Sequence, residues 1–128
     1  MAATLPNTTF ANELKTFFDN LANITNIRYV GDCVYANITP EILLKAEFRT
    51  LMTHGKYELI RVAAINKARG EIDHVDIPLP MTNTPYGSPC RKYLTLSSDG
   101  RLSWYSKPTP MEVNEIRGQI TNYANFFM

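Results

Sequence analysis

The first apolar positions of the chain recur with the period of an amphipathic helix. They are spaced i, i+4, i+7, i+8 and i+11, and they comprise Phe10, Leu14, Phe17, Phe18 and Leu21. A threonine at position 8 or 9 can accept hydrogen bonds from the free N–H groups of a first helical turn. The pattern therefore predicts a helix from about Thr9 to Ala22.

A second helix is predicted in the middle of the chain from its end signals. Thr39, Pro40 and Glu41 supply an N-cap, a proline at the first helical position and an acidic first turn. Gly55 suits the left-handed residue that ends many helices. The apolar positions between these signals cover more than one stripe, so we expect a helix over 40–55 with one surface available to a second copy of the chain.

The clearest capping signal lies near the C-terminus. Thr109 and Glu112 have the spacing of a capping box, with Pro110 between them. The apolar stripe that follows comprises Val113, Ile116, Ile120, Tyr123, Ala124 and Phe127. We predict a docked helix up to the C-terminus, with Phe126 off the stripe as a second contact or a lid over the core.

Three pairs of segments are rich in β-branched and aromatic residues and are separated by short turns. These pairs are 27–30 with 33–38, 57–65 with 71–79, and 92–96 with 101–105. Between the second and third pairs, prolines and Gly87 interrupt regular pairing and predict a loop of about ten residues. The element order is α-ββ-α-ββ-ββ-α. It predicts a single α+β domain over residues 1–128, with three helices on an antiparallel sheet of about six strands.

Composition and charge limit the function classes. Hydrophobic residues make up 45% of the 128 positions and charged residues 20%, as in ordinary globular domains, and the net charge is +1. Near neutrality disfavours a polycationic nucleic-acid binder. No apolar run approaches the roughly 18 residues of a membrane span. Cys33 and Cys90 lie far apart without a metal-binding spacing, so we expect reduced thiols and a cytoplasmic location.

One cluster of titratable residues could support acid–base chemistry. In a strand, His74 and Asp76 share one face, whereas Glu71 and Asp73 share the other. A histidine beside a carboxylate is the minimum for proton transfer or for two metal ligands. The other metal ligands have no candidates nearby, so we expect no metal, and His74 with Asp76 stays an alternative small-ligand site.

A second cluster lies on the third predicted hairpin. If Leu94, Leu96, Leu102 and Trp104 face the core, the opposite face carries Arg91, Tyr93, Arg101 and Tyr105. Tyrosine and arginine are enriched in binding surfaces because they offer large contact areas. Residues 91–107 hold four basic side chains against Asp99 alone, a local charge of +3. We take these four residues, with Tyr86 of the adjoining loop, as a candidate protein-binding face.

The preferred functional hypothesis is a small interaction protein. The sequence lacks the short motifs of phosphate-binding loops, dinucleotide sites, serine hydrolases, zinc proteases and EF-hands. We therefore predict a non-enzymatic adaptor, inhibitor or regulator that binds a protein partner, with a homodimer as one arrangement and no cofactor. The alternatives are a ligand site or enzyme at His74 and Asp76, and single-stranded nucleic acid stacked on Tyr93 and Tyr105.

Overall fold

Two helices and nine strands are found in residues 9–51 and 55–128, the part of the chain that the computed structural model describes. The helices are α1 (Phe10–Phe18) and α2 (Pro110–Asn125). The strands are β1 (Thr25–Val30), β2 (Cys33–Asn37), β3 (Ile42–Thr50), β4 (Tyr57–Asn66), β5 (Gly70–Pro78), β6 (Met81–Asn83), β7 (Pro89–Arg91), β8 (Tyr93–Leu96) and β9 (Leu102–Tyr105).

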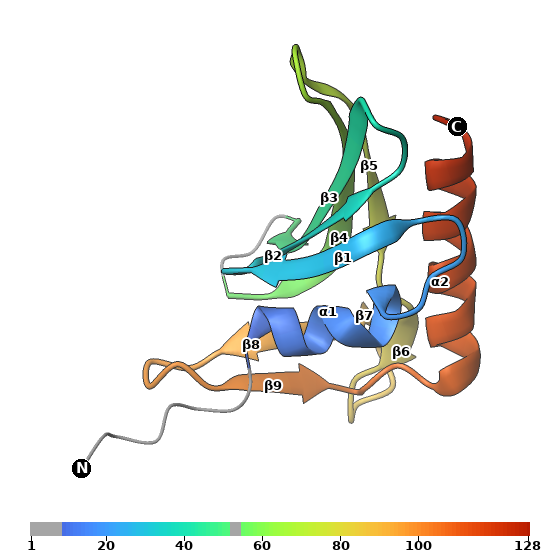
Figure 1. Ribbon diagram of the computed structural model, residues 1–128. Coiled ribbons are helices and arrows are strands. Elements are labelled where there is room, and N and C mark those ends of the chain that lie inside the picture. Colours follow the sequence, from blue (N-terminus) through green and yellow to red (C-terminus); the bar gives the residue numbers. More distant parts are fainter. Residues whose placement is uncertain (1–8, 52–54) are drawn as a thin grey trace.

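Seven strands form one curled antiparallel sheet (Figure 1). Its order is β1-β2-β3-β4-β8-β9. Strand β5 also pairs with β4, on the same side of β4 as β8. Helix α1 runs across the sheet, and α2 lies along its β5 side. The predicted α+β domain with an antiparallel sheet is confirmed.

The core lies between the inner face of the sheet and the two helices. Alternate residues of the central strands point inward, including Leu44, Ala46 and Phe48 of β3 and Ile60 and Val62 of β4. The predicted stripe of α1 is buried against them, and Thr9 caps the helix through its side chain. The helix ends at Phe18, earlier than predicted, because the chain becomes extended at Asp19 and takes a positive φ at Asn20.

The predicted helix over 40–55 is wrong, because most of this segment is strand β3. Thr39 accepts hydrogen bonds from the N–H groups of Glu41 and Ile42, but it closes the tight turn between β2 and β3 and caps no helix. The residues after it alternate between core and outer face with period two, and neighbours on both sides complete their hydrogen bonds. The second-copy surface expected on that helix therefore does not exist, and residues 52–54 lie outside the described part.

The predicted loop after the second hairpin also contains more structure than expected. Strands β6 and β7 pair as a short two-stranded ribbon, and residues 84–88 form its turn. Prolines at the strand ends did not prevent pairing because the ribbon is short and, among the described strands, β6 and β7 pair only with each other, which leaves each strand an edge where a proline costs no ladder bond. The other predicted hairpins are confirmed as β1–β2, β4–β5 and β8–β9.

An ion pair between the buried Lys92 and the partly exposed Glu112 fixes the start of α2 to the sheet. The Lys92 side chain is only 7% exposed, and its Nζ lies 2.6 Å from Glu112 Oε1 and 3.3 Å from the Lys107 carbonyl oxygen. Glu112 also accepts from the Thr109 N–H in the predicted capping box, which is confirmed. No helix among the described residues is both long and apolar enough to span a membrane.

Candidate functional site

A hollow of about 450 Å³ lies between the outer face of the β8–β9 hairpin and the turn of the β6–β7 ribbon. Three tyrosines contribute to its lining, and we call it the tyrosine hollow. Its lining residues are Lys56, Thr84, Pro85, Tyr86, Ser88, Cys90, Tyr93 and Tyr105.

Strand parity places two of the tyrosines side by side. Tyr93 and Tyr105 are directly opposed in the β8–β9 ladder, while the next pair, Leu94 and Trp104, faces the core side. The two phenol rings are stacked, with centroids 5.1 Å apart and an interplanar angle of 14°. Both are half-buried, so the hollow has a preformed aromatic wall.

The aromatic wall is held in place by polar contacts. The Tyr105 hydroxyl donates to the Asn83 carbonyl oxygen at 3.3 Å, which ties the hairpin to the ribbon. Desolvation, with the neighbouring Cys90 and Tyr93, raises the pKa of Tyr105.

The hollow carries positive charge. The ammonium group of Lys56 lies 5.1 Å from the centroid of the Tyr93 ring, within cation–π range. Lys56 is exposed, and the described lining contains no carboxylate. Tyr86 stands at the tip of the ribbon turn, 96% exposed, beside Gly87 with φ of 85°. An exposed aromatic side chain and the ammonium group of Lys56 thus border the same space.

The two arginines of the predicted face lie elsewhere. Arg91 donates from Nη1 to the Leu79 carbonyl oxygen at 2.6 Å and helps fix the base of the ribbon. Arg101 belongs to the β8–β9 turn, where it lies 3.6 Å from Asp99. It is opposite Ser97, four residues beyond Tyr93, which is about 13 Å along the strand. The structure therefore gathers Tyr86, Tyr93 and Tyr105 but not the arginines.

The expectation that all four apolar positions of this hairpin face the core is wrong for Leu96. Leu94 and Leu102 are buried and Trp104 packs against the core, but Leu96 is 45% exposed. Leu96 lines a small surface hollow with Thr9, Phe10 and Leu102, so its inward parity leaves the side chain only partly covered.

The alternative site at His74 and Asp76 is an exposed part of the outer sheet face. Asp76 accepts two hydrogen bonds from Arg61, at 2.7 and 3.0 Å, and these bonds lower its pKa. His74 Nδ1 lies 3.2 Å from Glu71 Oε2. The prediction that Glu71 shares a face with Asp73 is wrong, because the β4–β5 register shifts between these two residues.

These contacts leave little for catalysis or metal binding at His74 and Asp76. The Asp76 carboxylate is occupied by the Arg61 guanidinium, and His74 faces Glu71 on an exposed strand. Within the ranges 9–51 and 55–128, no three His, Cys, Asp or Glu residues are grouped to hold a metal ion.

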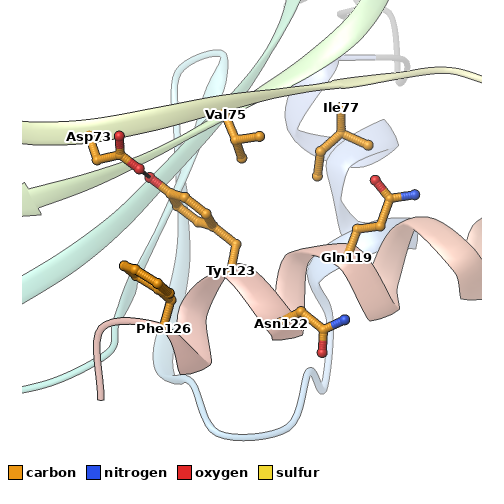
Figure 2. Close-up of a pocket in the computed structure, with 7 residues that line it drawn as sticks. All are labelled: Asp73, Val75, Ile77, Gln119, Asn122, Tyr123 and Phe126. Carbon is orange, nitrogen blue, oxygen red and sulfur yellow. Dashed lines mark hydrogen bonds between the residues drawn. The ribbon is translucent and has the colours of Figure 1, made fainter.

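A second groove, which the sequence did not predict, separates β5 from α2 (Figure 2). It has a volume of about 450 Å³. Tyr123 reaches across one end, where its hydroxyl donates to Asp73 Oδ2 at 2.9 Å, and burial with this bond raises the pKa of Tyr123. The one sequence feature that pointed to this groove was Phe126, which lies off the apolar stripe of the C-terminal helix and is 82% exposed. The lining is Asp73, Val75, Ile77, Gln119, Asn122, Tyr123 and Phe126.

Comparisons with known proteins add no further assignment. No protein-family model, curated protein or solved structure matches the chain.

Proposed function

We propose that the protein is a small, non-enzymatic interaction protein that binds an extended acidic segment of a partner protein in the tyrosine hollow. The stacked Tyr93 and Tyr105 side chains, with Lys56 above the first ring, are the observation that carries the proposal. Aromatic walls of this kind suit proline and aromatic side chains, which lose little conformational freedom on binding.

The charge of the hollow selects the partner's chemistry. Lys56 is the one charged side chain in the described lining, so a carboxylate of the partner gains a cation without meeting a fixed anion. The hydroxyls of Thr84 and Ser88 and the tip of Tyr86 offer additional polar contacts at the rim. The occupant that fits is a segment with an acidic residue next to proline or an aromatic residue.

Protein is a better partner than single-stranded nucleic acid. Stacking on Tyr93 and Tyr105 would suit bases, but the phosphates need a track of cations. Arg91 is engaged with a backbone carbonyl and Arg101 lies in the distant turn beside Asp99, so Lys56 is the one cation in the described lining. The two free thiols, Cys33 and Cys90, suit a reducing compartment such as the cytoplasm.

A displayed library of random 12-residue peptides tests this proposal. We expect the selected peptides to share an acidic residue beside proline or an aromatic residue. Tyr93→Ala should weaken their binding by roughly 5- to 30-fold, because it removes half of the aromatic wall. Binding is measured by fluorescence anisotropy, and thermal melts check the folding of each variant.

Lys56→Glu provides the electrostatic arm of the same test. This substitution should weaken the binding of the acidic peptides and remove most of the salt dependence of their association. Arg101→Glu is the matched control, since it reverses an exposed cation of the β8–β9 turn outside the hollow lining. Equal losses in the two variants, or peptides without acidic residues, would contradict the proposed ligand class.

A further inference from the structure

We propose that two copies of this chain associate through β5, pairing edge to edge in antiparallel order so that the sheet continues from one copy into the other. This goes beyond the tyrosine hollow, which lies on the β8–β9 hairpin, and does not depend on it. The β5 edge is open, since among the described strands β5 pairs with β4 alone.

Two observations show which backbone groups of β5 point to that open edge. The Leu79 N–H donates to the Glu58 carbonyl oxygen, and this pair continues the β4–β5 register. Hydrogen-bonded and non-hydrogen-bonded pairs alternate in an antiparallel ladder, so the backbone groups of Pro78, Asp76 and His74 point away from β4. A proline fits such an outward position because its missing N–H costs no ladder bond.

The charges of β5 favour one register between two copies. Residues whose backbone groups point outward must oppose one another, so His74 can face Asp76, His74 or Pro78 of the partner copy. With His74 opposite Asp76 in both directions, each imidazole meets the carboxylate of Asp76 of the other copy, which Arg61 of that copy also binds and which keeps further acceptor lone pairs. Val75 then meets its own copy on the two-fold axis. The neighbouring registers place His74 opposite His74 or Asp76 opposite Asp76, where like groups meet.

Charged residues on an edge strand normally oppose pairing. Here the order His-Val-Asp makes them self-complementary in an antiparallel pair, and four backbone hydrogen bonds form between His74 and Asp76 of the two copies. Val75 and Ile77 line the groove below, and the joined strands would cover its β5 side. Ile72, 46% exposed, lies on β5, and Phe126, 82% exposed, lines the groove directly after the last residue of α2.

Disulfide trapping tests the register directly. In a Cys33→Ser, Cys90→Ser background, Val75→Cys should oxidise to a covalent dimer, because non-hydrogen-bonded antiparallel partners have Cα atoms about 4.5 Å apart. Ile72→Cys is the matched control on the same strand. It should stay uncrosslinked because two such residues would lie about 20 Å apart along the pair.

Analytical ultracentrifugation of the unmodified protein measures the association itself. We expect a concentration-dependent dimer that His74→Pro weakens about ten-fold or more, because proline removes an outward N–H from each copy and leaves the β4 ladder intact. His74→Val keeps the N–H and should weaken the dimer less. Circular dichroism confirms that each variant is folded.

Three results would overturn the proposal. The first is a monomer at every concentration, which would leave a strand of another protein as the remaining occupant. The second is a dimer that His74→Pro does not weaken, and the third is crosslinking at position 72 as fast as at position 75. None of these results would affect peptide binding in the tyrosine hollow.

Discussion

Replacing Glu112 with alanine is expected to lower the free energy of unfolding by about 3 to 5 kcal/mol. The Lys92 side chain is 7% exposed, and the substitution leaves its ammonium group with the Lys107 carbonyl oxygen as the one remaining partner among the described residues. It also removes the acceptor for the Thr109 N–H and so breaks the capping box of α2. Urea unfolding followed by circular dichroism measures the change.

The double variant Lys92→Met, Glu112→Ala separates the buried charge from the lost cap. Removing the ammonium group along with its partner should restore part of the stability, because a methionine can occupy the site without desolvating a charge. A double variant as unstable as Glu112→Ala would show that the ion pair is not what fixes α2 to the sheet.

The same pair gives the stability a pH dependence of known sign. Its bonds with Lys92 and with the Thr109 backbone lower the pKa of Glu112 below its ordinary value of 4.5. The stabilisation is therefore present above about pH 4.5 and is lost as the pH falls through the lower folded value. The difference in stability between the wild type and Glu112→Gln should shrink over that acid range, as unfolding curves at several pH values would show.

Trp104→Ala is expected to cost about 3 to 5 kcal/mol and could abolish folding. The indole stands edge-on to Phe48, with centroids 6.2 Å apart, and its Nε1 donates to Glu13 Oε1 at 2.6 Å. It thus joins β9, β3 and α1 in one contact. Chemical unfolding of the variant, followed by circular dichroism, measures the loss.

Trp104→Phe is the control for this prediction, because it keeps an aromatic ring on Phe48 and loses the hydrogen bond to Glu13. It should cost clearly less than alanine. Tryptophan fluorescence of the wild type, which reports Trp104 alone, should be blue-shifted relative to free indole. A fully water-exposed spectrum would contradict the packing of the β8–β9 hairpin and the orientation of Tyr93 and Tyr105.

Local signals in the sequence were sufficient where one face of an element is buried. The stripe of α1, the capping box of α2 and the turns of three hairpins were all predicted from spacing and turn residues. The local signals failed at β3. Its Leu, Lys, Ala and Glu residues favour a helix, but the neighbouring strands on both sides impose an extended chain. Thr39 contributed to the error because one side-chain acceptor serves either a helix cap or a turn.

Parity could predict part of the candidate site but not its shape. Strand parity placed Tyr93 and Tyr105 on one outer face, and the pairing of β8 with β9 sets the two residues directly opposite each other. The distance to Arg101 depends on how far the strands extend, and the position of Tyr86 depends on the β6–β7 ribbon. The contact of Lys56 with Tyr93 and the groove between β5 and α2 each bring together residues that are far apart in the chain, so no local pattern in the sequence marks them.

The central claim is that the tyrosine hollow is the surface that contacts a partner. Its most direct test is photocrosslinking in extract from the native source, with benzoylphenylalanine at position 86 and, as the control, at the exposed Met111 of α2. The predicted result is a discrete protein adduct from position 86 that Tyr93→Ala or Lys56→Glu suppresses. Adducts from position 111 but none from position 86, or adducts from position 86 that persist in both variants, would contradict it.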